Sequence, residues 1–434
     1  MRILVGITEI AGYYAALAPA LRRRGHLVRC VITKPRNPGY DDPENTGFPA
    51  LVTEWCQRLG EIRNRSLVHK VYWKVMTGAV RIVVLLWALF TCEVFVFGFG
   101  RSLLPLNLDL PLLKLFGKKI LFVCHGSDSR PSYLDYGSVL DLKGDRRTLR
   151  KTRRDTKVRR ANVRRMDRWS DWIVENPFSS HFHSRRLVNW YIVGMPCTLP
   201  EAIPPEPEAG IKILHAPSSP LFKGTARIQE AVTRVQLEIP GLEMVTITGK
   251  PHGEVLAAIR TCHFVIDQLY SDTPCAGFAA EAAACGRPTI VGGFGWSPEW
   301  LQMSRLGEWP SLVCREEELE DAIRRMALDA GLRRNIAEAA IRRAQDWSDD
   351  HVAERIECIL ESRAPEDWYF DPAEIPVFYS GGGLPEDTVR KVIGELIAWK
   401  GKEVLALRHQ PRLERMAVEF AGSAGALPHT PGEG

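Results

Sequence analysis

A proline-rich segment near the middle of the chain separates two halves, each of which alternates short apolar strands with helices. Residues 195–210 include five prolines in sixteen positions, a density that predicts a stiff linker between domains. The chain has 434 residues, which is more than a single hydrophobic core usually serves. Because strands that alternate with helices form parallel sheets, we predict an α/β protein with two Rossmann-like domains that face one another across a cleft.

The first half, residues 1–194, predicts a parallel sheet with helical crossovers. We expect strands at 2–7, 27–33, 93–99, 119–125 and 171–176, helices at 13–26, 65–90 and 109–116, and a loop followed by a helix over 34–60. The longest apolar run, residues 79–90, is interrupted by Arg81 and is too short to span a bilayer. We therefore predict a core helix there, with a membrane-facing patch as the alternative.

The second half starts the pattern again after the linker. Strands are expected at 211–217, 244–249, 263–269, 288–293 and 311–314, and helices at 223–238, 252–261, 276–285 and 297–305, followed by three amphipathic helices at 316–328, 330–346 and 348–362. We assign 211–347 to the second domain and 348–364 to a helix that crosses back to the first. Residues 365–434 are expected to form a helical extension with a disordered end.

Cysteine usage and the first residues bear on the cellular compartment. The ten cysteines form no CxxC pair, and several lie in apolar runs such as the one that contains Cys124. This pattern favours reduced, buried thiols in a cytoplasmic protein. The first residues, MRILVGITEIAGYY, lack the basic and then apolar layout of a signal peptide, and they predict a strand instead.

A strongly basic stretch lies between two of the predicted strands. Residues 143–168 include thirteen Lys or Arg against three Asp, at a helical spacing. Such a stretch is usually the solvated face of a helix, and the alternatives are contact with an anionic acceptor or with a phospholipid surface. Aromatic side chains do not interleave with these charges, as the stacking of nucleic-acid bases would require. We therefore expect no nucleic acid as a partner.

Histidines follow two of the predicted strands. His125 ends the strand at 119–125 and precedes a loop that contains Asp128, which is an active-site position in an open parallel sheet. The alternative is that His125 only caps the strand. His181 and His183 form an HxH pair, but no third metal ligand lies nearby in the sequence. We therefore expect these two side chains at the surface, and no metal site.

The loop after the strand at 211–217 has the composition of a phosphate clamp. It contains Ser218, Ser219, Lys223 and Gly224 and leads into a helix. A helix N-terminus and its free N–H groups favour anions, and lysine adds a full positive charge. In the first domain, Gly12 precedes a helix in the same way, although a single glycine there could equally serve a tight turn.

Residues 267–291 supply the second part of a nucleotide site. They read as the end of a strand, a polar loop, a short Ala-rich helix that carries Glu281, and a second strand. A carboxylate has two acceptor oxygens and can bind both hydroxyls of a ribose. Gly277 allows the loop backbone to approach a ligand closely. A phosphate clamp and a ribose carboxylate on one domain describe a nucleotide-diphosphate site that needs no metal.

The chain resembles the GT-B-fold retaining glycosyltransferases of the group-1/family-4 type over about residues 1–362. The resemblance is strongest at HAPSSPLFKGT and at DQL…GFAAEAAACGRPTIV, and weaker at EIAGYYAALAPALRRRGH and DLPLLKLFGKKILFVCHGSDSR. It implies a GT-B architecture and the transfer of a sugar from a nucleotide-diphosphate sugar to an acceptor. It also implies that the anomeric configuration is retained, without a metal or another cofactor.

The resemblance further implies roles for particular residues. Lys223 would hold the diphosphate, Glu281 the ribose, and His125 would lie beside the donor sugar and support its developing charge. The residues expected to bind the donor are Gly12, Ser218, Ser219, Lys223, Gly224, Asp267, Gly277 and Glu281. The leaving phosphate itself would help to deprotonate the acceptor, so the protein would act by positioning and by electrostatic stabilisation.

Two positions depart from the pattern of this family. Thr273 stands where the family has a second Glu eight residues before the ribose Glu, and Ser218 stands where it has an Arg five residues before the clamp Lys. The side chains that could substitute are Asp267 and Asp272 for the sugar contacts and Arg130 and Arg227 for the charge. The loop around Thr273 is therefore where we expect the identity of the donor to be decided.

The leading hypothesis is a cytoplasmic glycosyltransferase that acts in glycan, glycolipid or natural-product assembly. Its partners would be a nucleotide-sugar donor and a carbohydrate, lipid-linked or small-molecule acceptor, with the basic stretch meeting an anionic acceptor or the inner face of a membrane. Two alternatives stay open. One is a non-catalytic subunit with the same fold, suggested by the two departures. The other is a sugar-nucleotide epimerase, which needs several acid/base side chains in the cleft, where the sequence offers mainly His125, Asp128 and Asp267.

Overall fold

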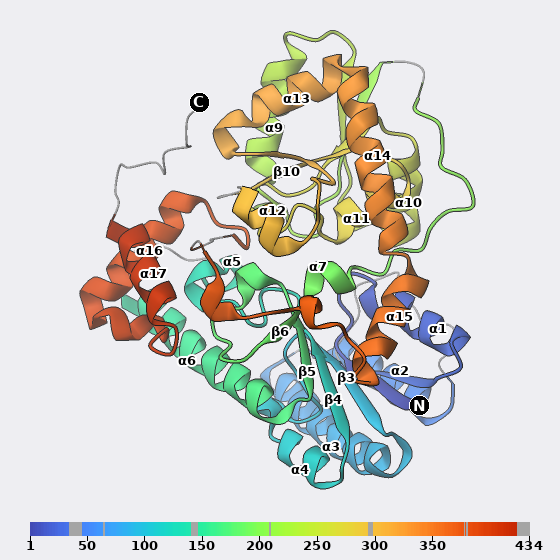
Figure 1. Ribbon diagram of the computed structural model, residues 1–434, viewed down its shortest axis with the longest axis vertical. Helices are drawn as coiled ribbons and strands as arrows, with labels where there is room; N and C mark the ends of the chain where they lie inside the picture. The colour runs from blue at the N-terminus through green and yellow to red at the C-terminus, as the bar shows by residue number, and fades with distance from the viewer. Residues whose placement is uncertain are drawn as a thin grey trace.

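The computed structural model describes residues 1–33, 46–63, 66–139, 146–207, 210–293, 298–376, 378 and 381–422. Several predictions fall at least partly outside these residues: the loop before the helix in 34–60, the start of the basic stretch at Lys143, the linker at 208–209, the first residues of the helices at 65–90 and 297–305, and the end of the chain from 423 to 434. Within the described residues, the chain forms two α/β domains, one above the other in Figure 1.

The first domain is built on a seven-stranded sheet in the order β12-β6-β5-β4-β3-β1-β2. Its strands are β1 (Arg2–Ile7), β2 (Leu27–Ile32), β3 (Val94–Gly98), β4 (Lys119–Val123), β5 (Trp172–Glu175), β6 (Leu187–Asn189) and β12 (Tyr369–Phe370). All neighbours are parallel except β12, which pairs antiparallel with β6. The five strands predicted for this half are confirmed, each within two residues. The short strand β6 was not predicted.

Helices cover both faces of this sheet (Figure 1). They are α1 (Tyr13–Arg23), α2 (Phe48–Ile62), α3 (Leu67–Thr91), α4 (Leu110–Leu115), α5 (Tyr136–Val139), α6 (Arg146–Trp169) and α7 (Trp190–Val193). Because both faces are covered, the central strands are apolar along their whole length, and every residue of β3 is buried.

The second domain has a five-stranded parallel sheet in the order β11-β10-β9-β7-β8. Its strands are β7 (Ile211–His215), β8 (Leu242–Thr246), β9 (Phe264–Ile266), β10 (Thr289–Gly292) and β11 (Leu312–Cys314). Its helices are α8 (Pro220–Lys223), α9 (Thr225–Gln236), α10 (His252–Arg260), α11 (Gly277–Ala284), α12 (Pro298–Ser304), α13 (Leu319–Leu328) and α14 (Ala330–Asp346). The predicted strands are confirmed within three residues. The carboxyl ends of β7 and β9 carry the loops of the predicted site.

The chain then crosses back to the first domain. Helix α15 (Asp349–Leu360) lies beside α1 (Figure 1), where Glu357 binds Arg24 at 2.6 Å and His26 at 3.0 Å. Strand β12 then adds an edge to the first sheet. The first domain is therefore completed by residues that follow the second domain in the sequence. The described part of the linker, 195–207, forms no helix or strand apart from an isolated bridge between Cys197 and Ser348.

The C-terminal extension is helical, as predicted, and it packs on the first domain. It contains α16 (Glu386–Lys400) and α17 (Pro411–Gly422), the red helices at the left of Figure 1. Val389 and Ile393 of α16 share a buried apolar cluster with Leu149 and Val163 of α6. One face of the basic helix α6 is therefore buried under the extension and its other face is exposed.

Helix α3 differs from the prediction for residues 79–90. A core helix was expected, and Val84, Leu85, Ala88 and Leu89 do pack into the core of the first domain. The opposite face of α3 is exposed, and Phe90 keeps 75% of its surface accessible. The error has a physical reason: α3 is apolar nearly all round, so its sequence carries no polar face to mark the solvent side. Among the described residues, α3 is the one helix long and apolar enough to cross a membrane.

Candidate functional site

A cavity of about 500 Å³ lies between the two domains, where α1 faces α11. Gly12 and its neighbours line it from the first domain, and His252, Gly277 and Glu281 line it from the second. Linker residues 195–201 form a third wall. Its volume is within the range of about 300–1,000 Å³ that is usual for small-molecule sites. The cavity therefore brings together Gly12, Gly277 and Glu281, three residues that the sequence singled out for one site.

The N-terminus of α11 gives this cavity a preference for anions. The first N–H groups of a helix have no partner within it, and the helix dipole places partial positive charge there. A Cβ atom on Gly277, the first residue of α11, would lie 3.2 Å from the Ala11 side chain. Gly12, with a φ of 76°, caps α1 across the cavity, but the N–H of Tyr14 in α1 already donates to Glu9. An anion is therefore expected at the N-terminus of α11.

Glu281 is held by a histidine that the sequence did not single out. Its carboxylate lies 2.8 Å from Nε2 of His252, and about one-fifth of each side chain is exposed. The hydrogen bond to Glu281 raises the pKa of His252 above its usual value of 6.5. His252 is the first residue of α10, in the strand–helix unit before that of Glu281. A ribose that binds Glu281 therefore has to displace this imidazole or share the carboxylate with it.

Lys223 is anchored at the carboxyl end of β9. Its Nζ lies 2.7 Å from Asp267 and 2.9 Å from the Gln268 side-chain oxygen. The Asp267 side chain is 1% exposed, so it pairs with Lys223 from inside the protein. It lines neither cavity of the cleft. Gly224, with a φ of 74°, joins α8 to α9 directly after Lys223. Since a lysine ammonium has three donors, these two contacts leave one N–H for a ligand.

A second cavity of about 860 Å³ lies on the other side of the cleft. Ser218 and Ser219 line it from the second domain, and Arg101 and Asp128 are among the residues that line it from the first. The Arg101 guanidinium lies over the Phe99 ring, and burial lowers its pKa. The two serines are therefore separated from Glu281. Of the residues predicted for one donor site, Gly12, Gly277 and Glu281 line the first cavity and Ser218 and Ser219 line the second, whereas Lys223, Gly224 and Asp267 line neither.

His125 is fixed by aromatic side chains beneath the cleft. Its Nε2 lies 3.2 Å from the Tyr14 hydroxyl, and the edges of Tyr13 and Tyr14 pack against its ring. Burial lowers the pKa of His125 to about 4, so the imidazole is neutral near pH 7. The backbone N–H of His125 donates to Asp128, whose pKa is raised to about 7 by burial and by the nearby Glu175. His125 lines neither of the two cavities.

A buried ion pair joins the two domains next to His125. Arg130 of the first domain lies 2.9 Å from Asp272 of the second, and their side chains are 4% and 15% exposed. Ser179 also donates to the Asp272 carboxylate at 2.9 Å. Residues 381–383 lie against this pair, and Gly383 donates its N–H to the Tyr270 carbonyl. Arg130 therefore links the two domains across the cleft. Arg227 pairs with Glu230 and Glu316 at the surface and lines neither cavity.

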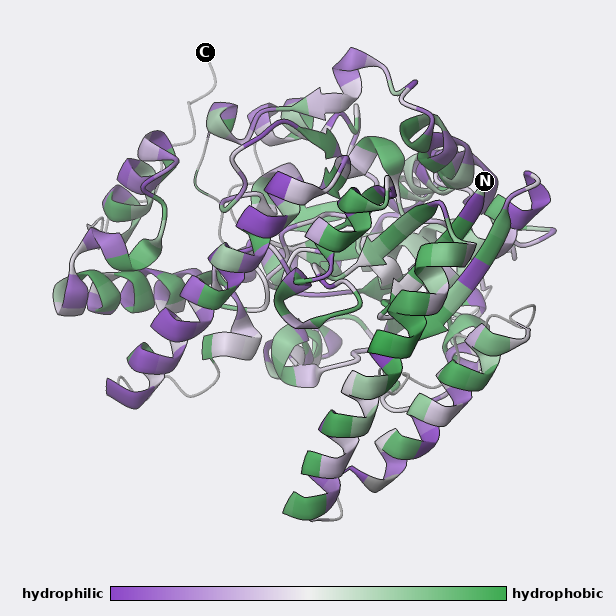
Figure 2. Cartoon of the chain, turned by 90° about the horizontal axis from the view of Figure 1, so that it is seen from below, coloured by the Kyte–Doolittle hydropathy of each residue, from purple (hydrophilic) through white to green (hydrophobic). Residues whose placement is uncertain are grey.

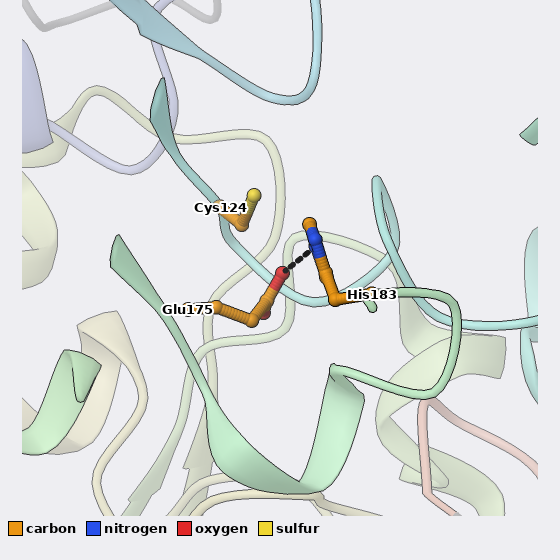
Figure 3. Close-up of side chains that lie close together, drawn as sticks. All are labelled: Cys124, Glu175 and His183. Atoms are coloured by element: carbon orange, nitrogen blue, oxygen red, sulfur yellow. Dashed lines mark ion pairs between the residues drawn. The ribbon is translucent and has the colours of Figure 1, made fainter. Parts of the chain in front are cut away.

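The HxH pair is buried, contrary to the expectation of surface side chains. His181 and His183 are 2% and 0% exposed. His183 lies 2.5 Å from Asp167 through Nδ1 and 3.3 Å from Glu175 through Nε2, and Cys124 completes the group (Figure 3). Although burial disfavours its charge, Asp167 and Glu175 raise the pKa of His183 to about 9. Cysteine, glutamate and histidine are metal ligands, but here an imidazolium already compensates the two carboxylates.

Sequence reasoning missed His252 and the pairings of residues that it did name, and in each case the two partners are distant in the chain. His252 and Glu281 are 29 residues apart, and Arg130 and Asp272 are 142 apart, from their numbers. For the buried histidine a signal did exist. Asp167 and Glu175 precede His183 by 16 and 8 residues, and a carboxylate at the end of an apolar strand, as Glu175 is, needs a partner.

Solved structures share this fold at low sequence identity. HepE from Anabaena, in structures with UDP and glucose and with UDP-glucose, superposes with a TM-score of 0.50 at 12% identity, over 83% of this chain and 100% of that chain. The fold is the GT-B architecture. An S. aureus MnaA–UDP structure superposes with a TM-score of 0.45 at 14% identity, over 84% of this chain and 99% of that chain. No protein-family model and no curated protein sequence matches the chain.

Proposed function

We propose that this protein is a glycosyltransferase that moves a sugar from a nucleotide-diphosphate sugar to an acceptor. The observation that carries the proposal is the cavity between α1 and α11, where Glu281 and the N-terminus of α11 lie side by side. A carboxylate suits the hydroxyls of a ribose, and a helix N-terminus suits the phosphates next to it. That HepE, which has the same fold, was solved with UDP and glucose supports a donor of this class.

In this proposal the diphosphate extends from α11 toward Lys223. The ammonium of Lys223 is already oriented by Asp267 and Gln268, so little side-chain freedom is lost when it meets a phosphate oxygen. The bond from the anomeric carbon to the phosphate oxygen breaks, and a bond to the acceptor oxygen forms. The acceptor proton passes to the leaving phosphate, and Lys223 and the dipole of α11 stabilise the charge on it. In this proposal His125, neutral and hydrogen-bonded to Tyr14, supports the donor sugar from beneath the cleft.

The resemblance to retaining glycosyltransferases of the group-1/family-4 type supports retention of the anomeric configuration in a reaction without a metal. The alternative of an epimerase differs in a measurable way, because an epimerase converts the donor sugar without any acceptor. A non-catalytic subunit would bind the nucleotide poorly or leave the donor unchanged.

We assign the acceptor to the larger cavity, which Arg101 lines. Because Arg101 makes no salt bridge within the described residues, its charge favours an acceptor that carries an anionic group, whether carbohydrate, lipid-linked or a small molecule. The ten cysteines are all free and nine are buried, which supports a reducing, cytoplasmic location.

The test is turnover with a panel of nucleotide sugars, followed by nucleotide release and by NMR of the product's anomeric configuration. We expect one donor to be consumed in an acceptor-dependent reaction with retention, and Lys223→Ala to abolish it. Lys250→Ala is the matched control, because Lys250 forms only an exposed pair with Glu254. The proposal fails if no donor is consumed, or if Lys223→Ala and Lys250→Ala are equally active.

A further inference from the structure

Helix α3 carries the largest unpartnered apolar surface of the described residues. Of the 21 large apolar side chains that are exposed among the described residues, nine lie on this one helix. They form the outer stripe of α3: Leu67, Val68, Val71, Tyr72, Val75, Ile82, Val83, Leu86 and Phe90. Single exposed apolar residues are common on soluble proteins, but a continuous patch of this length marks a surface that binds something.

One half of α3 packs on the sheet of the first domain, and the other half projects from it. Val84, Leu85, Ala88 and Leu89 pack into the core with strand β3, and Arg81 donates to Thr33 at the end of β2. The C-terminal half of α3 is therefore fixed to the sheet. The N-terminal half projects with α2 from the rest of the molecule, as the largely green helix at the lower right of Figure 2.

The charges around the outer stripe are of one sign. Helix α3 contains no Asp or Glu, while Lys70 and Lys74 are exposed beside the stripe. The N-terminal half of α6 extends to the same side of the molecule (Figure 2). It exposes a row of cations: Arg146, Arg147, Arg150, Lys151, Arg154 and Lys157. An exposed apolar stripe with cations beside it suits the interface of an anionic bilayer, where apolar side chains insert and cations meet anionic headgroups.

We propose that α3 and the N-terminal half of α6 form a membrane-binding surface. The outer stripe of α3 inserts at the boundary between headgroups and acyl chains, and the cations of α3 and α6 meet anionic headgroups. A second copy of this chain fits the stripe less well, because pairing two such helices brings Lys70 and Lys74 toward their own copies without an acidic partner on the helix. The inference does not depend on the proposed glycosyl transfer.

The test is flotation of the purified full-length protein with vesicles of phosphatidylcholine, with and without phosphatidylglycerol. We expect flotation with the anionic vesicles that weakens as salt is raised. The variant Val68→Asn/Val71→Asn/Val75→Asn should bind them at least about tenfold less, because each valine loses its apolar insertion. Leu237→Asn, at an 86% exposed leucine after α9, is the matched control and should bind like wild type.

Three results would overturn the proposal. The first is no flotation with either kind of vesicle, and the second is equal flotation of the triple variant and the wild type. The third is a dimer of the wild type, measured by light scattering without lipid, that the triple variant loses, since the stripe would then serve a second copy. Unchanged thermal unfolding of the triple variant shows that the loss of binding is not a loss of fold, as expected for side chains that are more than half exposed.

Discussion

The ion pair between Arg130 and Asp272 offers a sharp test of how the two domains are held. Both side chains are mostly buried, at 4% and 15% exposure, and each comes from a different domain. Removing one partner of a buried pair leaves the other charge uncompensated, which costs about 3–5 kcal/mol. We therefore expect Asp272→Asn to lower the free energy of unfolding by about that amount, although the amide oxygen that replaces the carboxylate still accepts the hydrogen bond from Ser179.

The matched double variant decides whether the uncompensated charge is the cause. Arg130→Met removes the guanidinium while keeping most of the side-chain volume, so Arg130→Met/Asp272→Asn leaves no buried charge at this position. We expect urea unfolding, followed by tryptophan fluorescence, to show the double variant more stable than Asp272→Asn alone. Glu308→Gln, which breaks an exposed pair with Arg342, should cost at most about 1 kcal/mol. Equal losses in Asp272→Asn and Glu308→Gln, or additive losses in the double variant, would refute the reasoning.

Three further predictions concern the site. Because Glu281 raises the pKa of His252 above 6.5, the pair stabilises the fold most below pH 6.5 and loses this effect as pH rises through the raised pKa. Nucleotide binding, measured by calorimetry, should tighten over the same pH interval. A His252→Gln variant that keeps this pH dependence would contradict the assignment. Because the pKa of His125 is lowered to about 4, its imidazole stays neutral from pH 5 to 8. The pH–rate profiles of wild type and His125→Asn should therefore differ in height and keep the same shape. Loss of one limb of the profile in the variant would show that His125 titrates in this range. Gly277→Val should abolish nucleotide binding, because even a Cβ atom there would lie 3.2 Å from the Ala11 side chain and the valine methyl groups would crowd the N-terminus of α11; undiminished binding would place the anion elsewhere.

Much of the fold follows from local patterns in the sequence. Buried parallel strands are apolar along their whole length, so their positions were predicted within three residues, and the helix at 348–362 followed from its amphipathic spacing. The exposed face of α3 did not follow, because an apolar sequence predicts burial on every side. Strand β6 has only three residues, and β12 depends on a partner strand that ends 180 residues earlier, from Asn189 to Tyr369.

The sequence predicted several residues of the site, but it did not predict which of them lie together. Glu281, Gly277 and Gly12 line one cavity, as their positions at helix N-termini and strand ends suggested. Ser218 and Ser219 belong to the other cavity, and Asp267 lies beneath Lys223. The Lys223–Asp267 pair forms inside the second domain, between residues 44 apart in the chain. The division of the predicted residues between two cavities depends on the relative position of the domains, which local sequence does not encode.

The most direct test of the central claim is calorimetric titration of nucleoside diphosphates into wild type, Glu281→Gln and Glu254→Gln. Glu254 is an exposed carboxylate on α10 that lines neither cavity, so it is the matched control. Loss of hydrogen bonds to a charged group costs about 1.5–3 kcal/mol, or about tenfold to 150-fold in affinity. We predict that one nucleoside diphosphate binds wild type and Glu254→Gln equally, and Glu281→Gln more weakly by that factor. Binding that is unchanged in Glu281→Gln, or absent from wild type for every nucleotide, would contradict the account.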